Sequence, residues 1–144
     1  MLLNVNAMNN IFYTGCLQSA PFFSEKKIAL VCIDSTLPNG FKGVHYPKLA
    51  PPQELSIAKG KKLIDQSVFD LLFSKYLKTL DVNEVIRALR RFAPETDQVA
   101  LLSGTRFDFQ SHRFLVGKWL TKNGYPTQES QDNFLKFYKQ TQLF

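Results

Sequence analysis

The sequence predicts an α/β protein with a mainly parallel sheet flanked by helices, in the three layers of a Rossmann-like fold. Short apolar segments alternate along the chain with segments of helical periodicity, an order typical of parallel strands joined by helices. One segment, KKIALVCIDS at 26–35, is apolar at successive positions, as expected for a strand covered on both faces. The length of 144 residues, without a repeat or a Gly/Ser linker, favours a single domain over 1–144.

Three strands are expected, at about residues 10–14, 27–33 and 98–103, and they should lie parallel to one another in one sheet. The second strand is followed by TLPNGFKGVHYPKLAPPQEL at 36–55, which holds four of the seven prolines. This composition predicts a long ordered loop, and long loops in compact domains are often functional.

Helices are expected between and after these strands. Apolar residues recur at three- and four-residue steps from Asp65, and Asp81 begins a second helix. A third helix should begin near Ser111 and end at Gly124. A further amphipathic helix over 127–144 could be appended, and a homodimer could form through its aromatic residues, which are Phe134, Phe137 and Tyr138.

Composition narrows the class of protein. Hydrophobic residues make up 44% of the chain and 13 residues are phenylalanine, which indicates a packed core. No apolar run approaches the roughly 20 residues that span a bilayer, and MLLNVNAMNN at 1–10 does not resemble a signal peptide. We therefore expect a cytoplasmic protein without a membrane segment. Cys16 and Cys32 do not form a disulfide framework, and no His/Cys spacing indicates zinc, so neither a metal nor a cofactor is expected.

Small polar residues follow each expected strand, where parallel sheets bind their ligands. The first strand ends at Thr14 and Gly15, the second at Asp34 and the third at Ser103. These residues are predicted to line a ligand pocket. No catalytic residue is assigned.

The expected helix at 111–123 starts with Ser111, His112 and Arg113. Ser111 is a natural N-cap, and a helix N-terminus favours an anion but disfavours a cation. One interpretation is that Arg113, with or without His112, binds a phosphate or carboxylate facing Ser103. The alternative is a salt bridge from Arg113 to Asp108 or another acid, with His112 packed in the core. His112 could also act as a base for Ser103.

The chain carries a net charge of +6 and a pI near 9.4, which mildly favours an anionic partner. Two groups of basic residues could contact the phosphates of a nucleic acid, or could form a solvated face. They are Lys59, Lys61 and Lys62, and on the second helix Arg87, Arg90 and Arg91. A nucleic-acid- or protein-binding module is therefore the alternative to a small-ligand pocket.

Three segments together carry a resemblance to a known family: IFYT at 11–14, FKGVHYPKLAPPQEL at 41–55 and LLSGTRFDFQSHRFLVGKWLTKNGY at 101–125. In order and spacing they are similar to a bacterial and archaeal family catalogued as domain of unknown function 488. The resemblance implies a fold and a pocket. The family pattern has cysteine where this chain has Ser103 and Ser111, and an acid where it has Thr105. Thiolate chemistry at these positions would be lost, so the resemblance implies a catalytically degenerate member.

Overall fold

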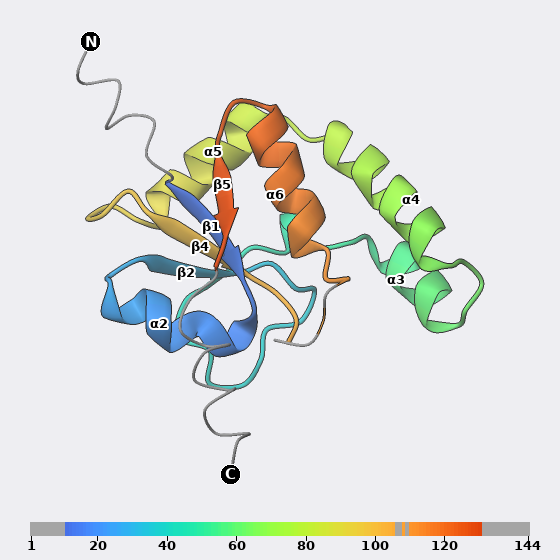
Figure 1. Cartoon of the computed structure of the whole chain (residues 1–144), viewed down its shortest axis with the longest axis horizontal. Helices are drawn as coiled ribbons and strands as arrows, with labels where there is room; N and C mark the ends of the chain where they lie inside the picture. Colours follow the sequence, from blue (N-terminus) through green and yellow to red (C-terminus); the bar gives the residue numbers. More distant parts are fainter. Residues whose placement is uncertain (1–10, 106–107, 109, 131–144) are drawn as a thin grey trace.

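The computed structural model describes residues 11–105, 108 and 110–130. Five strands form one parallel sheet in the order β3-β2-β4-β1-β5 (Figure 1). Their bounds are β1 Phe12–Gly15, β2 Ala29–Cys32, β3 Val44–His45, β4 Val99–Leu102 and β5 Thr127–Glu129. The expected α/β class is confirmed, and the three predicted strands are β1, β2 and β4 of the same sheet.

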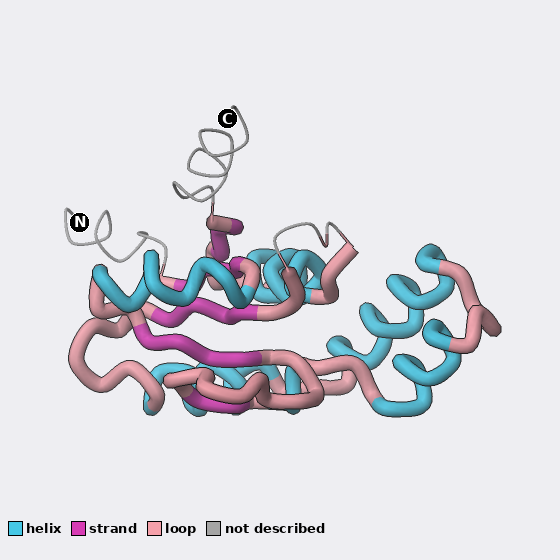
Figure 2. Tube along the Cα trace, turned by 90° about the horizontal axis from the view of Figure 1, so that it is seen from below, coloured by secondary structure: helices cyan, strands magenta, loops and turns pink. Residues whose placement is uncertain are grey.

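Helices cover both faces of this sheet (Figure 2). The helices are α2 Ala20–Glu25, α3 Gln53–Gly60, α4 Gln66–Lys78, α5 Val82–Arg91 and α6 Arg113–Lys122, with short 3₁₀ segments at Leu17–Ser19 and Pro47–Leu49. α2 packs on one face, and α4, α5 and α6 contribute to the larger core on the other. The two views together show that α3 and α4 extend beyond one end of the sheet.

β4 is the centre of the packing. All four of its residues are buried, and alternate side chains enter different cores because neighbouring residues of a strand point to opposite faces. Val99 and Leu101 join the larger core, whereas Ala100 and Leu102 join the smaller core beside Phe23. A strand buried on both faces explains why its sequence lacks polar alternation.

The predicted helix starts are confirmed for α4 and α5. The Asp65 carboxylate accepts a hydrogen bond from the Val68 N–H at 2.9 Å, and Asp81 accepts from the N–H of Asn83 at 3.0 Å. These side chains satisfy N–H groups that the helix itself leaves unpaired. In α4 the side chains of Phe69, Phe73 and Leu77 are buried in the larger core.

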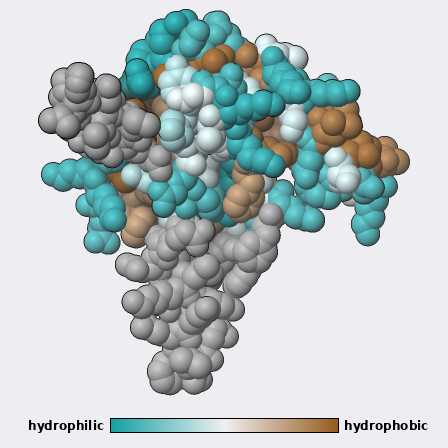
Figure 3. Space-filling model, turned by 45° about the horizontal axis from the view of Figure 1, so that its top comes forward, coloured by the Kyte–Doolittle hydropathy of each residue, from teal (hydrophilic) through white to brown (hydrophobic). Residues whose placement is uncertain are grey.

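The outer side of the α3–α4 pair is apolar. Six large hydrophobic residues are exposed in the described part of the chain, and five of them belong to α3, α4 or their connection: Ile57, Leu63, Val68, Leu71 and Leu72. Figure 3 shows hydrophobic atoms gathered over this end of the molecule.

The structure corrects two expectations about local structure. Residues 127–129 of the segment predicted as a helix form strand β5, which pairs with β1 in the register Phe12↔Thr127, whereas residues 131–144 of that segment lie outside the described residues. Gly124 adopts a φ of 94° after α6, a conformation that suits glycine, and the chain turns back toward the sheet. The aromatic residues proposed for a homodimer, Phe134, Phe137 and Tyr138, lie outside the described residues.

The second correction concerns the segment 36–55, which was predicted to be a long loop. It contains strand β3 and the start of helix α3.

No helix in the described part of the chain is long and apolar enough to cross a membrane. Cys16 and Cys32 are both free and buried. Burial raises the pKa of the Cys32 thiol, so this group stays protonated at neutral pH.

Candidate functional site

A cavity of about 560 Å³ lies at the carboxyl edge of the sheet. The strand register creates it, because Cys32 and Gly15 both lie opposite Leu102, so the residues that follow β2 and β4 emerge side by side. Its walls come from the segments after β2 and β4, from the start of α6, and from α3 and α4. This is the position at which parallel α/β sheets bind their ligands.

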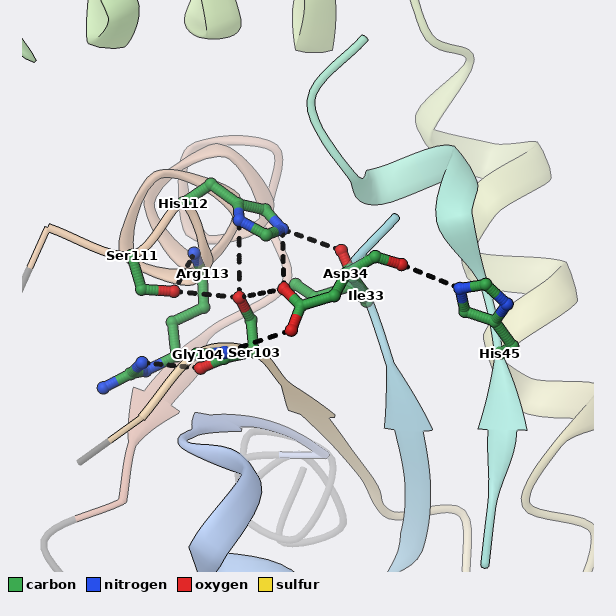
Figure 4. A network of polar contacts seen from close by, with 8 residues as sticks. All are labelled: Ile33, Asp34, His45, Ser103, Gly104, Ser111, His112 and Arg113. Carbon is green, nitrogen blue, oxygen red and sulfur yellow. Dashed lines mark hydrogen bonds and ion pairs between the residues drawn. The ribbon is translucent and has the colours of Figure 1, made fainter. Parts of the chain in front are cut away.

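Asp34 lines the cavity, and its carboxylate belongs to a network of polar contacts with the segment after β4 (Figure 4). Its Oδ1 accepts a hydrogen bond from the Ser103 hydroxyl at 2.6 Å, and its Oδ2 accepts from the Gly104 N–H at 3.2 Å. About a quarter of the side chain (27%) remains exposed. The carboxylate is therefore held in one orientation while still reaching the cavity. His45 supports the same segment, with its Nε2 2.7 Å from the Asp34 carbonyl oxygen.

Ser103 and Ser111 form the buried base of the cavity. Their hydroxyl oxygens are 2.9 Å apart, and the Ser103 oxygen is also 3.3 Å from Nδ1 of His112. The Ser111 hydroxyl accepts a hydrogen bond from the N–H of Arg113 at 3.3 Å. Ser111 is not the N-cap that the sequence predicted, because α6 begins at Arg113 and His112 takes the N-cap position. Because a hydroxyl has one proton and Ser103 donates it to Asp34, the Ser111 proton is free to point at Ser103.

His112 is buried between the sheet and α4. Its Nε2 is 2.7 Å from the carbonyl oxygen of Ile33, which can only accept, so Nε2 carries the proton and Nδ1 is the acceptor in the neutral ring. Burial lowers the pKa of His112 below its ordinary value of 6.5, against the opposing effects of the Ile33 carbonyl and the charge of Asp34. The ring meets Phe73 edge-on at 5.4 Å. His112 is therefore neutral at physiological pH.

Arg113 belongs to a different network. Its Nη1 donates to the Ser103 carbonyl oxygen at 2.7 Å, and its Nε and Nη2 lie 3.2 Å from the carboxylate of Glu129 on β5. Thr14 donates to the same carboxylate at 2.7 Å. The arginine is 3% exposed and is not among the residues that line the 560 Å³ cavity. Of the two interpretations of Arg113, the contacts match the salt bridge, with Glu129 as the acid in place of Asp108.

The predicted pocket residues are thus divided between two places. Asp34, Ser103, Ser111 and His112 line one cavity. Thr14 joins the Arg113 network, and Gly15 contributes its carbonyl oxygen, which accepts from the Ser103 N–H at 3.0 Å. Sequence reasoning missed Glu129 because it assigned residue 129 to a helix, and no local signal marks a three-residue strand.

Lys59 has a place that the sequence did not indicate. It lines the cavity beside Phe69, with its ammonium 4.4 Å from the centre of that ring. Lys61 and Lys62 follow α3 and are exposed. The exposed arginines of the other basic group, Arg87, Arg90 and Arg91, lie on α5, well apart from α3 (Figure 1).

Charges around the cavity are mixed. Among the described residues, the lining includes two carboxylates, Asp34 and Asp108, and one ammonium group, Lys59. Within residues 11–105, 108 and 110–130, no three His, Cys, Asp or Glu side chains are grouped in a way that could hold a metal ion.

We compared the chain with family models, curated proteins and solved structures, and none matches it. The resemblance to domain of unknown function 488 therefore stays a prediction.

Proposed function

We propose that this protein binds a small polar molecule in the cavity at the carboxyl edge of its sheet. The observation that carries the proposal is the buried polar network in the cavity wall. Ser103, Ser111 and His112 are 1%, 6% and 8% exposed. Ser103 donates to Asp34, and the Ser103 oxygen lies 2.9 Å from the Ser111 hydroxyl and 3.3 Å from Nδ1 of His112. Burying so many polar groups stabilises a fold less than apolar packing would, and such networks are typical of functional sites.

The contacts favour binding over nucleophilic catalysis. The Ser103 hydroxyl is 2.6 Å from Asp34 but 3.3 Å from Nδ1 of His112, so its proton is directed at the carboxylate. The Gly104 N–H also donates to Asp34, so it does not face the cavity as an oxyanion donor. We assign no reaction to the site.

The proposal is tested by ligand-induced stabilisation. Thermal melts of the purified protein with a panel of sugars, nucleosides, nucleotides, amino acids and inorganic phosphate should identify compounds that raise the melting temperature. Asp34→Asn keeps the size of the side chain and removes its charge, and should reduce the stabilisation by these compounds. Glu25→Gln, on the exposed surface of α2, is the matched control and should respond as the wild type does. A panel without any stabilising compound, or an Asp34→Asn variant with the full response, would refute the proposal.

A further inference from the structure

The charge and hydrogen-bonding groups of the cavity also indicate which class of polar molecule it takes, an inference that rests on the proposed function. We infer that the ligand is a neutral compound with several hydroxyl groups, such as a monosaccharide or the sugar of a nucleoside, and that a phosphate group on it weakens binding.

The first reason is the balance of charge in the lining. Asp34 and Asp108 contribute two negative charges. His112 is buried and its Nε2 is bonded to the Ile33 carbonyl, so it presents no positive charge to the cavity. Arg113, the cation that an anionic ligand would require, is bound to Glu129. Among the described residues of the lining, a phosphate would therefore face more negative than positive charge.

Lys59 does not reverse this balance. It is the one cation among the described residues of the lining, and its ammonium lies over the Phe69 ring at 4.4 Å. A cation in this position is already stabilised by the ring, and moving it to a ligand phosphate would remove that contact.

The second reason is the orientation of Asp34. The Ser103 hydroxyl donates to one carboxylate oxygen and the Gly104 N–H to the other, so the carboxylate group is not free to rotate. Each oxygen has a further lone pair, and a carboxylate fixed in this way can accept two neighbouring hydroxyl groups without losing side-chain freedom on binding. The hydroxyls of Ser35, Thr36 and Ser56 line the same cavity. They can both donate and accept, as sugar hydroxyls require.

The third reason is the apolar part of the wall. The lining also includes two apolar residues, Pro51 and Phe69. A carbohydrate ring has C–H groups on its faces and hydroxyls at its edge, so a cavity with both kinds of surface matches it. A volume of about 560 Å³ is sufficient for a monosaccharide or a nucleoside.

The test compares ligands that differ only in a phosphate. Isothermal titration calorimetry with ribose and ribose 5-phosphate, glucose and glucose 6-phosphate, and adenosine and adenosine 5′-monophosphate gives three neutral-to-charged affinity ratios. We expect the neutral member to bind at least about tenfold more tightly at low ionic strength, because the described residues of the lining carry more negative than positive charge. Added salt should reduce the ratio by screening.

A charge variant provides a second measurement. Lys59→Gln removes the cation and should lower the affinity for the phosphorylated member further than for the neutral member, so the ratio widens. Lys42→Gln, an exposed lysine between β2 and β3, has the same change of charge and should leave the ratio as in the wild type.

The outcomes separate the two proposals. Tighter binding of the phosphorylated members, sensitive to Asp34→Asn, would overturn the neutral class but keep the site. If other polar compounds of the wider panel bind but none of these sugars and nucleosides does, the neutral class is likewise overturned and the site is kept. Absence of binding by the whole panel would overturn the proposed function itself.

Discussion

Arg113 illustrates how a single residue can have two opposite interpretations. At the N-terminus of a helix a cation is unfavourable unless an anion compensates for it. A ligand and a carboxylate of the protein fulfil this requirement equally well. The structure places Glu129 at 3.2 Å, so the compensation is internal.

Arg113→Ala should therefore destabilise the protein in the absence of any ligand. Removing the guanidinium takes away the charged partner of the Glu129 carboxylate, to which Thr14 still donates, and the donor to the Ser103 carbonyl. We expect a loss of roughly 3 kcal/mol in the free energy of unfolding, toward the lower end of the cost of breaking a buried pair, because a quarter of the Glu129 side chain is exposed. Urea denaturation measures it.

Lys118→Ala is the control, since Lys118 is an exposed cation on the same helix. It should change the free energy of unfolding by less than about 0.5 kcal/mol. If Arg113→Ala were equally neutral, and phosphate stabilised the wild type alone, Arg113 would be an anion-binding residue and our assignment would be incorrect.

His112 should make the fold sensitive to mild acid. Because burial lowers its pKa in the folded protein, the unfolded chain takes up a proton more readily than the folded chain. This contribution to stability is complete above the ordinary value of 6.5 and is lost as the pH falls through that value toward the lower pKa of the folded state.

His112→Gln removes the titrating group and keeps a donor for the Ile33 carbonyl. Between about pH 7.5 and about pH 5, the melting temperature of the variant should fall less than that of the wild type. The comparison concerns the two changes with pH, since the variant also loses the contact with Phe73. An equal or steeper fall in the variant would show that His112 does not contribute to acid sensitivity.

At the scale of elements, the small edge strand β3 depends on a close approach of the backbone. A Cβ atom on Gly43 would overlap the Leu30 carbonyl oxygen of β2 and lie 2.8 Å from the Leu30 Cβ. Only a residue without a side chain allows β3 to pair with β2 at this point. Since β3 carries His45, which contacts the carbonyl oxygen of Asp34, the same glycine supports the cavity wall.

Gly43→Ala should destabilise the protein by about 1–3 kcal/mol, the usual cost of overpacking. Gly60→Ala is the matched control, because a Cβ on this last residue of α3 would have no neighbour within 4 Å. It should leave the stability unchanged or slightly higher, since alanine favours helix. Thermal melts of the two variants test the difference, and similar losses in both would contradict the close approach at Gly43.

The N-caps and the apolar periodicities of α4 and α5 could be predicted from the sequence because they depend only on residues that are close together in the chain. An aspartate that accepts from N–H groups two or three residues away needs nothing from the rest of the chain. The apolar steps in α4 likewise indicate which side is buried. The same reasoning failed for residues 127–129, where a polar Thr-Gln-Glu segment becomes a strand through its pairing with β1.

In the whole molecule, β4 is flanked by β2 and β1 and buried on both faces. Its amides should exchange with solvent deuterium only through global unfolding, and at least about tenfold more slowly than those of the edge strands β3 and β5. Hydrogen exchange followed by mass spectrometry or NMR measures this order. Exchange in β4 as fast as in β5 would mean that the sheet does not open from its edges inward.

The sequence by itself determined the α/β class, the three inner strands, the capped helices α4 and α5, and the meeting of Asp34 with Ser103 at one sheet edge. These follow from side-chain patterns a few residues long and from the common direction of parallel strands. Tertiary structure alone decided the edge strands, the pairing of Arg113 with Glu129 and the position of Lys59 in the cavity wall. The physical reason is that edge pairing uses main-chain hydrogen bonds, which every residue offers, and that ion pairs form between segments whose distance in sequence says nothing of their distance in space.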